Sequence, residues 1–255
     1  LMETTLENIE FEAGGLNHFS ILLRAKYKDS GEDGYPFIKK NFSEYYSDLV
    51  NDHEGFYSNP GAERGLFFEL FKQYGYLPIT TDSHLGEYLP WAYSVVDHDG
   101  ILDFYDKYKK RCLSFYSNDG YDQFFDMSHP EPHERAIPII ESIVDDSNML
   151  EHAVNIKNDN FIKCLPNDVV VEVPATINKT GVHGKVLEDY PNSFGALLNS
   201  QVGTIQLTTN AILNKSKQAA KYALLADPIV GNSNAVESLL DTMIEFQKEY
   251  LGYLK

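Results

Sequence analysis

The stretch AGGLNHFSILLRAKY, residues 13–27, limits the fold more than any other part of this 255-residue chain. From residue 19 to 27, bulky apolar residues alternate with polar ones, which is the period of a half-buried strand, with Leu22 out of phase. Two glycines and an Asn-His pair come before the strand, and the glycines would let the backbone turn sharply there. The helical patterns that follow indicate a mixed α and β architecture.

Most of the remaining chain has helical or strand periodicity. The predicted helices cover 37–50, 65–76, 102–116, 133–146 and three segments within 195–254, and the predicted strands cover 153–158 and 168–177. The aromatic residues of the first three helices are expected to be core or helix contacts. Between 77 and 94 the pattern breaks into a loop bounded by prolines, where polar site residues tend to lie. No repeat or linker divides the chain, so we expect one domain.

Acidic residues outnumber basic ones, 38 to 21, which gives a net charge of −17. Nucleic acids and anionic membrane surfaces are bound mainly by Lys and Arg, so this balance argues against both as partners. The two cysteines, Cys112 and Cys164, have no metal-ligand or redox spacing, which favours a reducing compartment and leaves a single bridge open. No segment reaches the roughly 18 apolar residues of a membrane span. We therefore expect a cytoplasmic protein.

Familiar catalytic motifs are missing from the sequence, which has no GxGxxG after a strand, no P-loop, no HExxH and no GxSxG. His18 is one candidate site residue, because a neutral imidazole binds divalent transition metals. Asn17 beside it could hydrogen-bond a sugar hydroxyl or orient the ligand. A capping or core role for His18 is the alternative, and the residue types alone do not decide between the two.

A second candidate cluster, His84, Glu87 and Tyr88, lies in the segment HLGEY. His84 and Tyr88 are four residues apart and would share one face of a helix. A tyrosine acts as a general base only if its pKa is brought down from about 10, and a nearby metal or cation is the usual means. Without a metal, the simpler interpretation is that the Tyr88 hydroxyl satisfies a buried partner.

Arg135 heads the predicted helix 133–146 and could bind a carboxylate or phosphate of a ligand through its fork of donors. It could equally pair with Glu131 or Glu134 on its own turn. Three other histidines have no persuasive metal spacing relative to one another, namely His129, His133 and His183.

Five segments together resemble the C-terminal portion of the family 4 glycoside hydrolases, which include α-glucosidases, α-galactosidases, α-galacturonidases and 6-phosphoglycosidases. The segments are GGLNHFSILLR (14–24), SHLGEYLPW (83–91), ERAIPIIESIV (134–144), VVVEVPATINKTGV (169–182) and ALLADPIVGNSNAVESLLDTMIEFQKEYL (223–251). The order NHF, EYLPW and EVPA makes the resemblance specific, and it covers nearly the whole chain. It implies a lactate-dehydrogenase-like C-terminal domain, an α+β fold in which a mainly antiparallel sheet is flanked by helices.

The resemblance also implies an unusual hydrolysis of O-glycosidic bonds, outside the two-carboxylate scheme of most glycosidases. In such enzymes NAD⁺ takes hydride from C3 of the sugar, a base removes the C2 proton and the aglycone leaves by elimination, after which water adds and the hydride returns. A divalent ion, usually Mn²⁺, polarises the C2 and C3 oxygens. The implied cofactors are NAD and Mn²⁺. The implied partner is a glycoside or oligosaccharide, and the form HLGEYLPW favours non-phosphorylated α-glycosides.

Carried onto this sequence, the resemblance implies that His18 is one of two protein ligands to the metal. It implies that Tyr88 is the base that removes the C2 proton, a role that the adjacent cation would make feasible. Asn17 is expected to contact substrate, and His84 and Glu87 to line the substrate site or support Tyr88. Arg135 is expected to bind a substituent of the substrate.

Two parts of the family pattern are missing. The cysteine motif that supplies the other metal ligand belongs shortly upstream of NHF, and Cys112 and Cys164 lie in the wrong contexts to replace it. The glycine-rich Rossmann half is missing too. We therefore expect residues 1–255 to be the C-terminal domain for substrate and metal binding and for oligomerisation, without NAD-binding residues and inactive alone. The alternative is a non-catalytic binding or assembly domain, because the striped helix 234–254 suits a homo-oligomer interface.

Overall fold

The computed structural model describes residues 2–51, 64–117 and 135–255. Its centre is a six-stranded sheet with the order β3-β2-β1-β5-β4, in which β6 also pairs with β5. All of these pairings are antiparallel. The strands are β1 (Ile9–Leu16), β2 (Phe19–Tyr27), β3 (Leu77–Pro78), β4 (Met149–Lys157), β5 (Val170–Asn178) and β6 (Gly181–Gly184). The predicted α+β fold with a mainly antiparallel sheet is confirmed.

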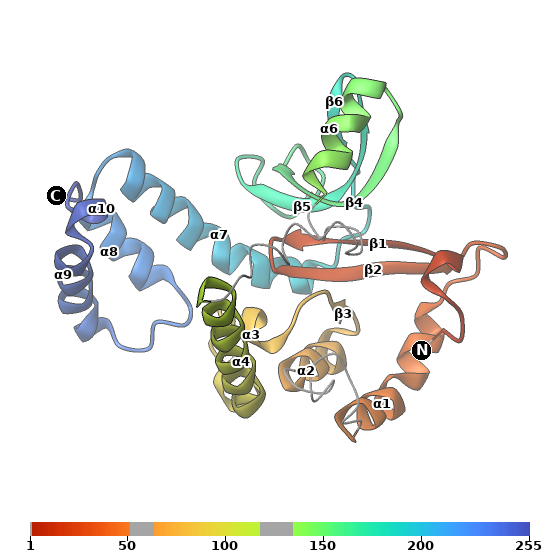
Figure 1. Cartoon of the computed structure of the whole chain (residues 1–255), viewed down its shortest axis with the longest axis horizontal. Helices are drawn as coiled ribbons and strands as arrows, with labels where there is room; N and C mark the ends of the chain where they lie inside the picture. Colours follow the sequence, from red (N-terminus) through yellow and green to blue (C-terminus); the bar gives the residue numbers. More distant parts are fainter. Residues whose placement is uncertain (1, 52–63, 118–134) are drawn as a thin grey trace.

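Helices flank this sheet (Figure 1). In this view α1 to α4 lie on one side of β1 and β2, α6 lies beside β4, β5 and β6, and α7 leads away to α8, α9 and α10. The bounds are α1 (Tyr35–Asn51), α2 (Gly65–Tyr74), α3 (Asp82–Leu85), α4 (His98–Ser117), α6 (Ala136–Asp145), α7 (Asn192–Leu213), α8 (Lys217–Ala226), α9 (Val236–Phe246) and α10 (Lys248–Leu251). Among the described residues, no helix combines the length and the apolar composition needed to cross a membrane.

Two clusters of buried apolar side chains connect these elements. The larger one joins β2 to α7 through Phe19 and Phe194. The smaller one joins α1 and α2 through Phe42 and Phe71, whose ring centroids are 4.1 Å apart. The expectation that helical aromatics make core or helix contacts is confirmed there. On α4, Tyr105 and Tyr108 are exposed and contact Phe104 of the same helix, so they are helix contacts and not core residues.

β1 and β2 form a hairpin whose two-residue turn is Asn17 and His18. The glycines lie inside β1, so the interpretation that they make the turn is wrong. A Cβ on Gly15 would lie 2.3 Å from the Phe19 carbonyl oxygen, and one on Gly14 would lie 2.8 Å from the carbonyl oxygen of Glu172 on β5. The glycines therefore allow close approach of neighbouring backbones.

The out-of-phase Leu22 lies next to a β-bulge. Glu12 pairs with Arg24 and Ala13 pairs with Leu22, which leaves Leu23 without a partner residue on β1. An extra residue of this kind disturbs the alternation of side chains along the strand. As a result Leu22 packs against the smaller cluster and Leu23 against the larger one.

Pairing of β3 with β2 brings the predicted loop 77–94 to the hairpin turn. Leu77 pairs with Leu22, and the Ile79 N–H donates to the Ser20 carbonyl oxygen at 3.0 Å. Because the pairing is antiparallel, the chain runs along β2 toward Asn17 and His18 as it leaves β3. Residues that follow β3 thus arrive beside the turn, although about 60 residues separate them from it in sequence.

A buried carboxylate fixes the start of α3. Asp82 is fully buried, and its side chain accepts hydrogen bonds from the backbone N–H groups of Leu66 (2.9 Å), Phe67 (2.9 Å) and Asp97 (3.1 Å). Two of these donors belong to the first turn of α2, where backbone N–H groups have no partner within the helix. Asp82 therefore ties α2, α3 and the chain before α4 together.

We expect the substitution Gly15→Ala to destabilise the protein by about 1–3 kcal/mol, because the added methyl group overlaps the Phe19 and Ser20 backbone of the adjacent strand. Urea denaturation measures the loss. The matched control is Gly203→Ala on α7, where an added Cβ meets nothing within 4 Å and helix propensity predicts a gain of roughly 0.5–1 kcal/mol. Equal effects of the two substitutions would contradict the packing role of Gly15.

Candidate active site

The hairpin turn presents Asn17 and His18 at the surface of the protein, where both side chains are exposed. His18 has a φ of 59°, in the left-handed region that a residue other than glycine rarely adopts. Such a backbone persists only where the surroundings impose it, and it is enriched at functional sites. Here the pairing of Leu16 with Phe19 imposes the turn and directs the imidazole.

Residues of and just after α3 lie against this turn. The His84 and His18 rings have centroids 4.1 Å apart, at an interplanar angle of 46°. The Tyr88 ring stacks on Phe19 at 4.8 Å, and its hydroxyl donates to the Asn17 carbonyl oxygen at 3.4 Å. Two segments far apart in sequence thus meet, and the structure brings together the predicted residues Asn17, His18, His84 and Tyr88.

The environment of Tyr88 opposes its ionisation. Burial raises the pKa of the Tyr88 hydroxyl above its ordinary value of 10.0, and the negative charge of the neighbouring Glu87 raises that pKa further. Glu87 itself is exposed. The charge of Glu87 therefore disfavours the phenolate form of Tyr88, and the expected role of Glu87 in lining the substrate site or supporting Tyr88 stays a prediction. An added cation near the hydroxyl would be needed to favour the phenolate.

A cavity of about 840 Å³ opens beside the cluster, between the hairpin turn, the edges of β4 and β5, and α7. Its lining is rich in amide and hydroxyl groups, and among the described residues that line it Asp168 is the one with a charge. Gln206 donates to both carboxylate oxygens of Asp168, at 3.1 and 3.2 Å. The lining residues are Leu16, Asn17, Tyr88, Asn155, Asp168, Val169, Val170, Gln201, Ile205, Gln206, Thr209, Asn210 and Leu213.

Sequence reasoning missed the contribution of α7 to this cavity. Gln201 is buried and donates to the Tyr88 carbonyl oxygen at 3.1 Å, so it positions the segment that contains the tyrosine. Gln206, Thr209 and Asn210 resemble an ordinary solvated helix face in sequence. The one available signal was the polar Gln201 on the apolar side of the helix, next to Val202.

The cluster supplies only part of a metal site. His18 and His84 are nitrogen donors suited to a divalent transition metal, and the buried Nδ1 of His84 has no hydrogen-bond partner. The described residues contain no group of three or more His, Cys, Asp or Glu side chains able to bind a metal. Both cysteines are free thiols. The chemistry of the donors fits a metal, and the remaining ligands would have to come from elsewhere.

Arg135 lies at the start of α6, beside β4 and away from the hairpin turn. Its Nε atom pairs with the nearly buried carboxylate of Glu151 on β4 at 2.8 Å, and its Nη2 atom lies 3.7 Å from the Met149 sulfur. The alternatives Glu131 and Glu134, like His129 and His133, are outside the described residues. Binding of a substrate substituent by Arg135 stays a prediction, and Glu151 already uses part of its donor fork.

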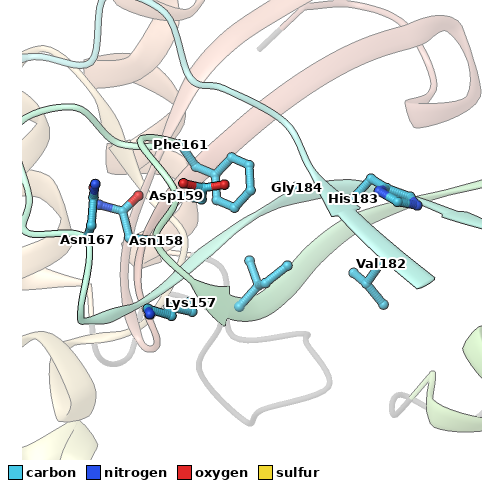
Figure 2. A pocket seen from close by; sticks show the side chains of 9 residues that line it. Lys157, Asn158, Asp159, Phe161, Asn167, Val182, His183 and Gly184 are labelled. Atoms are coloured by element: carbon cyan, nitrogen blue, oxygen red, sulfur yellow. The ribbon is translucent and has the colours of Figure 1, made fainter. Parts of the chain in front are cut away.

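A second hollow, of about 640 Å³, lies between β6 and the chain after β4. Figure 2 shows Asp159 and Phe161 on one side of it and His183 and Val182 on the other. The His183 Nε2 atom is already hydrogen-bonded to the Thr180 hydroxyl at 2.7 Å. None of the predicted site residues lines this hollow, so we place the candidate active site at the hairpin turn.

Comparison with known proteins assigns the chain to a family. The model of the family 4 glycosyl hydrolase C-terminal domain matches residues 13–230, so the chain belongs to this family. An α-glucosidase of Erwinia rhapontici is 39% identical over 282 residues, which cover 100% of this chain and 60% of that protein. An α-galactosidase of Bacillus subtilis (strain 168) is 26% identical, over 87% of this chain and 50% of that protein.

A solved structure has the same fold. A 6-phospho-α-glucosidase from gut microorganisms, in complex with NAD and Mn²⁺, superimposes with a TM-score of 0.69 at 21% identity. The match covers 96% of this chain and 57% of that one. The predicted family and its C-terminal fold are therefore confirmed. The chain spans about 60% of the length of the α-glucosidase that it matches.

Proposed function

We propose that this chain is the substrate- and metal-binding part of a glycosidase, with residues 1–255 acting as its C-terminal domain. The observation that supports this function best is the meeting of His18, His84 and Tyr88 at the hairpin turn, beside a cavity with amide and hydroxyl side chains in its lining. An imidazole able to bind a metal, next to a tyrosine that lines a cavity, provides groups that proton abstraction next to a carbonyl requires.

The cofactors in this proposal are NAD and Mn²⁺, the groups bound in the 6-phospho-α-glucosidase. When bound, they would supply hydride acceptance at C3 and polarisation of the C2 and C3 oxygens. Residues of this chain would bind the metal and the substrate and take the proton. His18 would bind the metal, Asn17 would hydrogen-bond a sugar hydroxyl, and the Tyr88 hydroxyl oxygen would take the C2 proton. Stacking on Phe19 and the bond to the Asn17 carbonyl orient the Tyr88 ring before substrate arrives.

An uncharged α-glycoside is the substrate class that the cavity favours. Its described lining contains the carboxylate of Asp168 and no Lys or Arg, and the sequences of 52–63 and 118–134 contain neither of these residues. A 6-phosphate would therefore meet like charge without a balancing cation from this lining. The 39% identical relative is an α-glucosidase, which agrees with this class.

The test compares this chain with the protein translated from the full reading frame, upstream codons included. We call this the full-frame protein. Each is assayed with NAD⁺, Mn²⁺ and a reductant on nitrophenyl glucosides, galactosides and galacturonides, and on the 6-phosphates of the first two. We expect the full-frame protein to cleave a neutral α-glycoside at least about tenfold faster than its 6-phosphate, because one unbalanced charge contact is worth on the order of a few kcal/mol. This chain alone is expected to be inactive.

Each of the other possible results of these assays would contradict one part of the proposal. Cleavage by this chain alone would contradict the incomplete site. No cleavage of any glycoside by the full-frame protein would contradict the proposed glycosidase activity, and preference for a 6-phosphate would contradict the proposed substrate class.

A cytoplasmic location also belongs to this proposal, supported by the free thiols and the acidic composition.

The second candidate function is a non-catalytic assembly domain. α9 and α10 expose the apolar side chains Leu239, Met243, Phe246 and Tyr250 at helical spacing, with Phe246 82% exposed. Figure 1 shows α8, α9 and α10 at the far end of α7, away from the sheet. An exposed stripe of this kind favours contact with another subunit.

Light scattering of the wild type and of Phe246→Ser tests whether this stripe is a subunit interface, since an unchanged oligomer would argue against this surface.

A further inference from the structure

The ring of His84 has a polar atom that the described structure leaves unsatisfied. Its Nδ1 atom is buried and has no hydrogen-bond partner, a condition shared among the described side chains only by the Thr204 hydroxyl. A buried polar atom without a partner destabilises the folded state, because it has lost its hydrogen bonds to water. Because such atoms are rare in folded proteins, this one indicates an interaction that forms when the site is complete.

His18 needs a partner of this kind. A histidine that binds a metal through one ring nitrogen usually donates the N–H of its other nitrogen to an acceptor, which fixes the tautomer and the orientation of the ring. The side chain of His18 is exposed at the tip of the hairpin, and the His84 ring is its aromatic neighbour at 4.1 Å. The nearby carbonyl oxygen of Asn17 already accepts the Tyr88 hydroxyl.

We propose that His84 is a positioning residue for His18: the N–H of the His18 ring nitrogen that does not bind metal donates to the Nδ1 atom of His84. The step from the present contact is a rotation of the imidazoles about their broad χ2 torsions. His84 is then neutral, with its proton on Nε2. The inference rests on the proposed function for the metal at His18, and it replaces the substrate-contacting role expected for His84.

Variants of His84 separate the role of the Nδ1 atom from the role of the ring. His84→Asn places an amide atom near the Nδ1 position, His84→Gln places one near the Nε2 position, and His84→Phe keeps a ring without an acceptor. We expect Mn²⁺ affinity of the full-frame protein, measured by electron paramagnetic resonance, to fall about 10–100-fold in the Gln and Phe variants. The Asn variant is expected to retain most of the wild-type affinity.

Nitrogen-15 NMR of the imidazoles in this chain gives a readout that needs neither metal nor turnover. We expect His18 to populate one tautomer in the wild type and in His84→Asn, and a mixture in His84→Gln and His84→Phe. His98→Asn, a change at an exposed histidine on α4, is the matched control and should leave the His18 signals unchanged. If His84→Phe does not fold, the Asn and Gln pair still tests the inference.

Three results would overturn the inference. They are a His18 tautomer unaffected by every His84 variant, equal Mn²⁺ affinity in the Asn and Gln variants, and two imidazole nitrogens bound directly to the metal in electron-nuclear double resonance. Absence of Mn²⁺ binding by the wild-type full-frame protein would count against the proposed function instead. The tautomer measurement would then still decide whether His84 orients His18.

Discussion

Tyr88→Phe is expected to lower kcat/KM for glycoside hydrolysis by about 10²–10⁴-fold in the full-frame protein, the usual contribution of a positioned general base. The phenyl ring keeps the stacking contact with Phe19, so neither stability nor Mn²⁺ affinity should change much. The one hydrogen bond lost is the 3.4 Å contact to the Asn17 carbonyl oxygen. Steady-state kinetics on a nitrophenyl α-glycoside measures the effect.

Tyr93→Phe is the matched control for this variant. Tyr93 lies five residues further along the chain and is 82% exposed, so removal of its hydroxyl should leave kcat/KM unchanged. A deuterium at C2 of the substrate adds a second readout, because slower C2 proton removal should raise the kinetic isotope effect in Tyr88→Phe. Loss of activity without any change in this isotope effect would argue that Tyr88 has a structural role only.

Asp82→Ala is expected to reduce the free energy of unfolding by about 3 kcal/mol, because it leaves three backbone N–H groups without an acceptor in a buried site. Asp82→Asn should recover part of this loss, since its single oxygen can still accept. Urea denaturation followed by circular dichroism measures both. The control Asp99→Ala, at an exposed carboxylate on α4, should cost less than about 1 kcal/mol. Equal losses at the two positions would refute the anchoring role of Asp82.

The pH dependence of this difference has a defined sign. Burial raises the pKa of the Asp82 carboxyl above its ordinary value of 3.8, against the opposing effects of the three N–H donors and of Arg64. The folded state therefore binds the proton more tightly than the unfolded state does. The stabilisation from protonation is fully present below the ordinary pKa and is lost as the pH rises through the raised pKa. The stability advantage of wild type over Asp82→Ala should accordingly shrink with rising pH in that window.

Much of the fold could be predicted from periodicity. The helices α1, α2, α4 and α7 and the strands β2 and β5 follow apolar patterns that local spacing reveals. β1 could not be predicted, because its glycine pair resembles a turn until the neighbouring backbones are in place. Gly14 lies against the backbone of Glu172, and Gly15 lies against the backbone of Phe19. The contact with Glu172 joins residues far apart in sequence, so no local pattern indicates it.

The candidate site was predictable residue by residue but not as an arrangement. The motifs indicated His18 and Tyr88, and the structure brings them together through pairing of β3 with β2, which local spacing does not specify. The contribution of Gln201 depends on tertiary structure alone, because 113 residues separate it from Tyr88. The raised pKa of Tyr88 depends first on its burial, which local spacing does not give. Arg135 looked available for a ligand because its partner Glu151 lies 16 residues further along the chain.

The direct pairing of β2 with β3 also bears on how relatives of this protein can diverge. Leu22 pairs with Leu77, so the chain that leaves β2 after Tyr27 returns at Leu77 to pair with the same strand. Insertions, deletions or exchange of that excursion, α1 and α2 included, would leave the hairpin turn and the His84 segment in register. Evolution can thus remodel the surroundings of the candidate site without changing how its residues are placed.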